Sequence, residues 1–226
     1  MQYRWLVIDL WRRRASALRG ALALVCAVMA APVEELVEAA SRRSIVPIEA
    51  FVVREGGEPV VSKDWLDGQV AHANALFWPA KVGFEIESVQ AISERFAHLS
   101  SRADRDALAD HPRTPGRVHL FVVRRLDDVD VEGNLLYGVH WRLRRDRAQT
   151  WVIMSTRDES STVLAHELGH LFELPHSRYP KSIMNKREDV KLPWPERVFA
   201  EPEIERIRRQ ARRHIDSGRL VPAGQP

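Results

Sequence analysis

A short segment near residue 170 holds the residues of this chain best suited to chemistry. The segment HELGH, residues 166–170, places His166 and His170 four positions apart. Four positions advance an α-helix by about 400°, so the two imidazoles would lie on one face, one turn apart, where they can share a zinc ion. Glu167 would lie on the flank of that face, within reach of a water molecule bound to the metal. The alternative interpretation is an ordinary helix that carries two surface histidines.

The residues around this segment favour a helix from about Ser160 to Phe172. Burial on the faces away from the histidines would come from the apolar residues Val163, Leu164, Leu168, Leu171 and Phe172. Ser160 or Ser161 is suited to cap the first turn, because a serine hydroxyl accepts a hydrogen bond from a backbone N–H that has no partner within the helix. The pattern therefore predicts that a helix presents the two histidines.

The segment HELGHLFELPHS, residues 166–177, followed by SIMN, residues 182–185, resembles the metzincin clan of zinc peptidases. These proteins carry H-E-x-x-H-x-x-G-x-x-H and then a turn that contains methionine. The resemblance is to small bacterial matrixin-, archaelysin- or snapalysin-like members, and it implies that Glu167 is the catalytic base and that Met184 lies in the turn beneath the metal. The ligands of one catalytic zinc ion would then be His166, His170 and His176.

One position departs from the metzincin pattern, because Glu173 stands where these peptidases have glycine. That glycine lets the backbone turn sharply, often at positive φ, which other residues adopt at a cost of roughly 1 kcal/mol. Pro175 pushes Leu174 out of the helical conformation, so we expect the helix to end near Glu173. Glu173 is also a rival third ligand, since it lies seven residues after His166 and carboxylates bind zinc. At a rise of about 1.5 Å per residue it lies roughly 7–8 Å beyond the level of the metal, which favours His176.

A strand expected at Leu135 to Leu143 precedes the active-site helix by one further strand. In metzincins the strand at this place is an edge strand that pairs with the peptide substrate. The resemblance therefore implies substrate binding, as an added antiparallel strand, along Gly138, Val139 and His140. The alternative is an ordinary internal strand.

Three acidic residues, Asp128, Asp130 and Glu132, resemble the start of a calcium-binding loop. A calcium loop needs a bidentate glutamate at its twelfth position, which in this chain is Val139. We therefore interpret the segment as an acidic surface turn, with a calcium site as the less favoured alternative.

The remaining patterns predict an α+β domain of the zincin or metzincin type, with a mixed twisted sheet, an active-site helix and a C-terminal helix. Strand patterns cover residues 44–54, 83–92, 117–124, 135–143 and 150–155. Helical patterns cover residues 62–78, 103–110, 160–172 and 202–216, with Ser62 as the N-cap of the first. We expect one peptidase domain, residues 32–226, with an upper lobe to about residue 173 and a small lower lobe over residues 174–226.

Residues 1–31 have the pattern of an export signal. An arginine cluster at residues 12–14 precedes a short apolar run, residues 20–31, which ends in Ala30-Ala31. A positive segment, a short apolar segment and a small-residue exit are typical of a secretory signal, and the run is shorter than the roughly 20 apolar residues of a membrane helix. We therefore expect an exported protein, secreted or periplasmic, with residues 1–31 removed or kept as an N-terminal anchor. A buried first helix is the alternative.

Composition narrows the function classes further. The formal charge of +3 comes from the N-terminal segment, because residues 1–31 hold five arginines against one aspartate, which leaves −1 for residues 32–226. Nucleic acid is therefore not an expected partner. The single cysteine, Cys26, lies in the expected signal, so metal ligands must come from His, Asp or Glu, and a cysteine-blocked pro-form is excluded.

Together these features predict an exported zinc-dependent endopeptidase that hydrolyses peptide bonds through a metal-activated water. We expect a monomer that acts on a peptide or protein substrate and has no stable membrane association after signal removal. One alternative is a catalytically weak zinc-binding module that recognises peptides, which the intact Glu167 argues against. The other is a zinc amidohydrolase that acts on a non-peptide amide. A cleavage assay distinguishes the endopeptidase from the first alternative, and a substrate-library screen distinguishes it from the second.

Overall fold

The structure is a computed structural model, and it describes residues 43–157, 162–186, 193 and 196–224. Residues 44–226 form one unit, to which the following description applies. The expected signal at residues 1–31 lies outside the described residues. Among the described residues, no helix is both long and apolar enough to cross a membrane.

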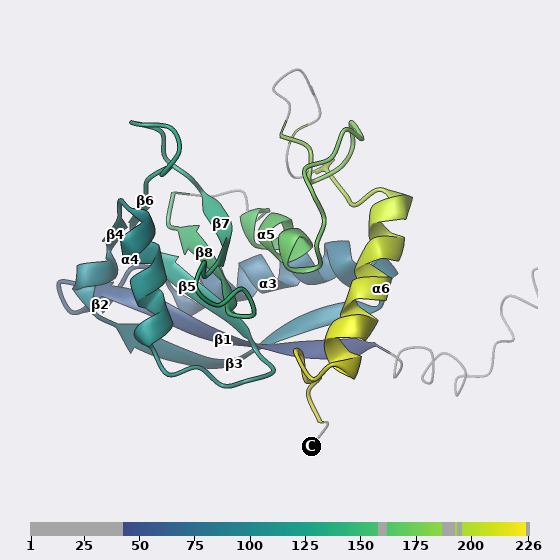
Figure 1. Cartoon of the computed structure of the whole chain (residues 1–226), viewed down its shortest axis with the longest axis horizontal. Helices are drawn as coiled ribbons and strands as arrows, with labels where there is room; N and C mark the ends of the chain where they lie inside the picture. Colours follow the sequence, from purple (N-terminus) through teal and green to yellow (C-terminus); the bar gives the residue numbers. More distant parts are fainter. Residues whose placement is uncertain (1–42, 158–161, 187–192, 194–195, 225–226) are drawn as a thin grey trace, which may run out of the picture. The chain divides into compact units, whose positions relative to one another are not determined.

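A mixed sheet of six strands forms the centre of this unit (Figure 1). Its strands are β1 (Ser44–Glu55), β2 (Glu58–Pro59), β3 (Val82–Ile92), β5 (Val118–Val123), β7 (Gly138–Arg142) and β8 (Thr150–Ser155). Strands β3, β1, β5 and β8 are parallel neighbours in that order, and the short β2 pairs antiparallel with the end of β1. Strand β7 pairs antiparallel with β8 and ends the sheet on that side. The predicted α+β fold with a mixed sheet is confirmed.

Four α-helices of the described residues accompany the sheet. They are α3 (Lys63–Phe77), α4 (Arg102–Ala107), α5 (Val163–Leu171) and α6 (Glu201–Asp216). The 3-10 turns η1 (Trp78–Ala80), η2 (Glu94–Phe96) and η3 (Leu108–Asp110) and a small parallel pair, β4 (His98–Leu99) with β6 (Arg125–Leu126), complete the described elements. As predicted, Ser62 caps α3, where its Oγ accepts a hydrogen bond from Trp65 N at 3.1 Å.

The strand expected at residues 135–143 is shorter in the structure. Leu135 and Leu136 bond to the neighbouring segment instead, through the bridge between Asp127 and Leu135 and a 2.8 Å bond from Leu136 N to Leu126 O. Pairing with β8 therefore spans Gly138 to Arg142. The strand therefore begins at Gly138, the residue beside the active-site helix, and not at Leu135 as expected.

Helices α4 and α5 lie on opposite faces of the sheet. Gly138 of β7 faces α5, since a Cβ at this position would lie 2.5 Å from Val163 Cγ1. Trp141, three residues later, faces α4, where its Nε1 donates to Asp106 Oδ1 at 2.7 Å. Side chains of a strand alternate between its two faces, so Gly138 and Trp141, three positions apart, point to opposite faces. The helices that they contact therefore lie on opposite sides of the sheet.

Aromatic packing fixes α5 against the rest of the core. The buried ring of Phe77 in α3 lies 5.1 Å from that of Phe84 in β3 and 5.7 Å from that of Phe172 at the end of α5. It also lies 4.8 Å from the ring of Phe199, just before α6. Each buried aromatic ring removes a large apolar area from water, so this cluster joins three helices and the sheet.

Candidate metal centre

Helix α5 presents the HELGH segment from within the core. Leu164, Ala165 and Leu168 are fully buried, as the helical pattern requires. The N-cap is Thr162, whose side chain makes no capping hydrogen bond. The predicted serine caps, Ser160 and Ser161, lie outside the described residues.

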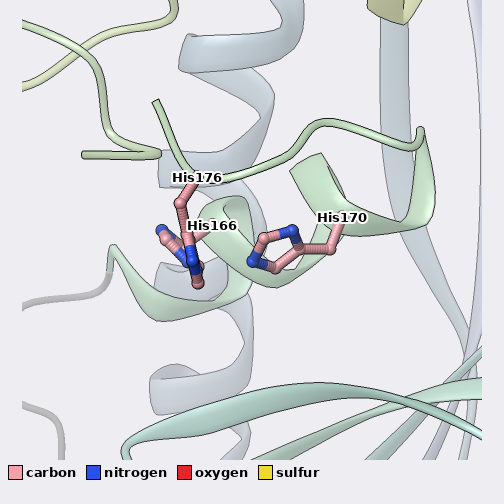
Figure 2. Close-up of side chains that lie close together, drawn as sticks. All are labelled: His166, His170 and His176. Carbon is pink, nitrogen blue, oxygen red and sulfur yellow. The ribbon is translucent and has the colours of Figure 1, made fainter. Parts of the chain in front are cut away.

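The structure brings three histidines together. One ring nitrogen from each of His166, His170 and His176 lies within 4.8 Å of the others. Figure 2 shows the ring of His170 pointing toward those of His166 and His176, with His176 reaching the cluster from the chain that follows the helix. The ring centroids of His166 and His170 are 4.9 Å apart, and that of His176 lies 5.6 Å and 4.9 Å from them.

Backbone carbonyls fix how two of these rings are turned. His166 Nδ1 lies 2.8 Å from Ile183 O, and His170 Nδ1 lies 2.7 Å from Leu174 O. Because a carbonyl oxygen only accepts, each Nδ1 must carry the proton and donate it. The Nε2 lone pair is then available to a metal, which is the arrangement found around metal-binding histidines.

The three imidazoles are neutral at physiological pH. Burial lowers the pKa of His166 to about 3 and also lowers the pKa of His170. Desolvation, helped by the charge of Lys186, lowers the pKa of His176 to about 4. A protonated imidazole has no lone pair to donate, so these shifts keep all three rings able to bind a metal. Three neutral imidazoles suit zinc, and the residues present therefore fit such an ion.

The turn after the helix explains how His176 reaches this cluster. Glu173 has φ = 62°, the left-handed conformation expected of a residue that stands where metzincins have glycine. Its carboxylate accepts a 2.8 Å hydrogen bond from Gln210 Nε2 on α6. It is therefore held by α6 and is not part of the histidine cluster, while the chain beyond it turns back with His176.

Glu167 lies beside the cluster with one fixed contact. Its side chain is buried, and Oε2 accepts a hydrogen bond from His140 N at 2.7 Å. Burial raises the pKa of Glu167 to about 7, while the charge of Lys186 and the His140 N–H act in the opposite direction. A carboxyl group that gains and loses a proton near neutral pH is suited to general acid–base chemistry.

Met184 lies under the helix, in the turn expected from the sequence. It is fully buried, and a Cβ on Gly169 would lie 2.5 Å from Met184 Sδ. Ser182 Oγ accepts a 3.0 Å bond from Met184 N and donates to the Glu203 carboxylate at 2.8–2.9 Å. The turn is therefore anchored to the first turn of α6.

Four residues of this framework have packing or anchoring roles that the sequence did not predict, although Gly138 was expected to bind substrate. Gly138 and Gly169 permit close contacts with α5, while Ser182 and Glu203 hold the methionine turn. Gly169 did carry a signal, because glycine in a helix interior costs roughly 1 kcal/mol relative to alanine and so indicates a need for space. The Ser182–Glu203 bond joins residues 21 positions apart and has no local signature.

The three residues expected to bind substrate occupy the edge strand. Gly138 and His140 face α5, and a Cβ on Gly138 would also lie 3.1 Å from Glu167 Cγ. The His140 ring is half-buried, and its Nε2 makes no hydrogen bond. Val139 points to the other face, toward α4. The structure thus brings two of the three next to Glu167.

Two carboxylates of the acidic turn have partners within the protein. Asp128 accepts hydrogen bonds from Asp130 N at 2.9 Å and from Asn134 Nδ2 at 3.1 Å. Asp130 forms an ion pair with Arg102 of α4. The arrangement is that of a surface turn stabilised by its own side chains.

Comparison with protein families matches the segment that carries the site. The family model of matrixin, a peptidase family, matches residues 135–192, which include β7, α5 and the methionine turn. No curated protein matches this chain.

Solved structures match most of the domain. Archaemetzincin from Methanopyrus kandleri is 17% identical with a TM-score of 0.52, over 76% of this chain and 98% of that one. Mirolysin is 11% identical with a TM-score of 0.50, over 77% and 97%. Metalloproteinase-II from Bacteroides fragilis is 12% identical with a TM-score of 0.50, over 74% of this chain and 53% of that one. The resemblance of HELGHLFELPHS to metzincins is confirmed: the chain has a metzincin-like fold and matches the matrixin family model around its active-site helix.

Proposed function

We propose that this chain is an exported zinc-dependent endopeptidase that acts as a monomer. The observation that carries the catalytic part is the position of Glu167, whose carboxylate lies beside three clustered imidazoles and is held by the N–H of His140 on an edge strand. Base, ligands and substrate-pairing strand thus meet at one place.

Each residue of the site has a definite role in this proposal. The ligands of one zinc ion are His166, His170 and His176, the first two oriented by carbonyls. Zinc, when bound, supplies a Lewis acid that polarises a carbonyl and activates water near neutral pH. Glu167 removes a proton from the attacking water and then delivers it to the leaving amine. Met184 packs beneath the ligand helix and supports it.

The substrate would lie along the free edge of β7. Tyr137 O accepts from Ser155 N at 2.8 Å, and Leu143 N donates to Gln149 O at 3.1 Å, so the odd-numbered residues of this strand bond to β8. Main-chain groups of the even-numbered residues, 138, 140 and 142, consequently point away from β8, and of these His140 N already donates to Glu167 Oε2. An extended peptide can pair there as an antiparallel strand, and its two ends run on beyond the site, which favours an endopeptidase.

A cleavage assay on the full chain tests the catalytic proposal. We expect about one zinc ion per chain by metal analysis, hydrolysis of unstructured protein substrates such as casein, and loss of both with a chelator. Re-addition of zinc should restore cleavage. A zinc-loaded protein that cleaves no peptide bond would contradict the proposal.

Export rests on the arginine cluster and short apolar run of residues 1–31. We expect N-terminal sequencing of protein recovered outside the cytoplasm to begin near Ala31 or Pro32. Intact Met1 in protein that stays in the cytoplasm would contradict export.

A further inference from the structure

A basic groove follows the free edge of β7. This pocket of about 390 Å³ is lined by four consecutive residues of the strand, 139–142, and by Lys186, which follows the methionine turn. Successive side chains of a strand point to opposite faces, so a pocket that touches four in a row lies along the edge itself. The groove therefore occupies the place where an added peptide strand would lie.

Three cations of this groove have no acidic partner among the residues that the structure describes. Arg142, Arg144 and Lys186 line it and are exposed to solvent. None of the three forms an ion pair with a residue in the part of the chain that the structure describes. Their charge is thus available to a ligand.

The acidic residues that line the groove are already engaged. Asp130 is ion-paired with Arg102, and Asp128 accepts two hydrogen bonds within its own turn. The remaining arginine, Arg105, is buried over the ring of Trp141 at 4.9 Å and donates to a backbone carbonyl. A positive excess is left at the end of β7, which matches an anionic group on the occupant of the groove.

We propose that this groove selects peptides with an acidic side chain on the N-terminal side of the scissile bond, an inference that rests on the proposed peptidase function. Strand β7 runs from Gly138 to Arg142, and an antiparallel substrate runs the other way. Substrate residues opposite Arg142 therefore precede those opposite His140. Because His140 N holds Glu167, the residue opposite His140 lies at the reacting centre.

The register then places the acid. In an antiparallel pair one substrate residue faces each residue of the strand, so the residue opposite Arg142 stands two positions N-terminal to the one opposite His140. The main-chain groups of Arg142 and His140 both point away from β8. Residues directly opposite in an antiparallel pair have their side chains on one face, with Cβ atoms about 5 Å apart. A glutamate there can reach the guanidinium of Arg142, and Lys186 lines the same groove.

Matched peptides test this selectivity. Zinc-loaded full-length protein is given peptides that carry Glu or Gln at each of the four residues before the cleaved bond. We expect kcat/KM to be about three- to tenfold higher for Glu at the second or third residue, since opposite charges across strands favour pairing and two cations contribute. The preference should shrink in 0.5 M NaCl, because exposed charges are screened.

Charge variants assign the preference to the groove. Arg142→Gln should bring the Glu/Gln ratio close to one, whereas Arg147→Gln, an exposed arginine outside the groove, should leave it unchanged. A binding comparison of the same peptides with zinc-loaded Glu167→Ala gives a second measurement that needs no cleavage. A ratio within twofold in both assays, or one that Arg142→Gln does not change, would overturn the inference. If no peptide is cleaved, the peptidase function fails, and the binding ratio still decides the groove.

Discussion

At the scale of single residues, the site depends on which atoms are held by the protein and which are left for a ligand. Carbonyls occupy Nδ1 of His166 and His170, and the N–H of His140 occupies one oxygen of Glu167. Each of these groups is fixed by one hydrogen bond and retains a second functional atom. Ligands and base can therefore be separated by substitution.

Replacing the base should abolish activity and spare the metal. In Glu167→Ala we expect zinc content and the thermal midpoint to match those of the wild-type protein, because the carboxylate is not among the three clustered ligands. Peptide hydrolysis should fall by about 10²-fold or more, the usual cost of losing a general base. Activity within about tenfold of wild type would assign the base elsewhere.

The third ligand can be tested by a pair of substitutions. His176→Ala should lose zinc, because its ring completes the cluster. Glu173→Gly should retain zinc, and its free energy of unfolding should change by less than about 1 kcal/mol, since relief of positive φ offsets the lost bond to Gln210. Metal analysis of both variants decides, and the reverse pattern would make Glu173 the ligand.

At the scale of elements, the site depends on helix α5 lying very close to its neighbours. Gly138 permits contact with the edge strand, and Gly169 permits contact with the methionine turn. In both places the space for a Cβ is filled by an atom of another element. The positions of β7, α5 and Met184 relative to one another thus depend on glycine, which has no side chain, at positions 138 and 169.

Alanine substitution of two helical glycines should have opposite effects. Gly169→Ala should destabilise the fold by about 1–3 kcal/mol, because its Cβ would meet Met184 Sδ at 2.5 Å and overpack the core. Gly68→Ala in α3 is the control: the position is exposed, nothing lies within 4 Å of a Cβ there, and alanine should stabilise by up to about 1 kcal/mol. Urea unfolding of the two variants measures both changes, and equal effects would contradict the close contact.

At the scale of the whole molecule, α6 joins the site to the rest of the fold. Glu203 in its first turn holds the methionine turn, and Gln210 holds Glu173. Near its end, His214 stacks on Phe172 with ring centroids 5.9 Å apart. A titratable group thus lies inside the packing between the two helices.

This histidine should make stability depend on pH. Burial, reinforced by the charges of Arg219 and Arg142 and opposed by Glu173, lowers the pKa of His214 to about 4. The unfolded chain, with an ordinary histidine pKa near 6.5, binds the proton first as pH falls. Stability from His214 is therefore present above about pH 6.5 and is lost between about pH 6.5 and 4, by up to about 3 kcal/mol.

The test compares wild type with His214→Leu in the presence of a chelator, so that acid release of zinc does not enter. The difference in free energy of unfolding between the two proteins should change over this pH range in favour of the variant. Parallel pH profiles would show that His214 does not titrate as described.

The sequence by itself predicted the chemistry proposed for the site. The spacing of HELGH predicted two imidazoles on one helix face, and Pro175 with Glu173 predicted where that helix ends. Strands β1, β3, β5 and β8 were also predicted to within about one residue at each end. These features could be predicted because helix periodicity, strand alternation and chain stiffness act between neighbours along the chain.

Only the tertiary structure decided how that chemistry is held. The bond from His140 N to Glu167 spans 27 positions, and the one from Ser182 to Glu203 spans 21. The register of β7, the fit of Met184 against Gly169 and the basic groove beside Arg142 likewise depend on which elements become neighbours. Such contacts form between segments far apart in the chain, so no local pattern encodes them, and packing of the whole core selects them.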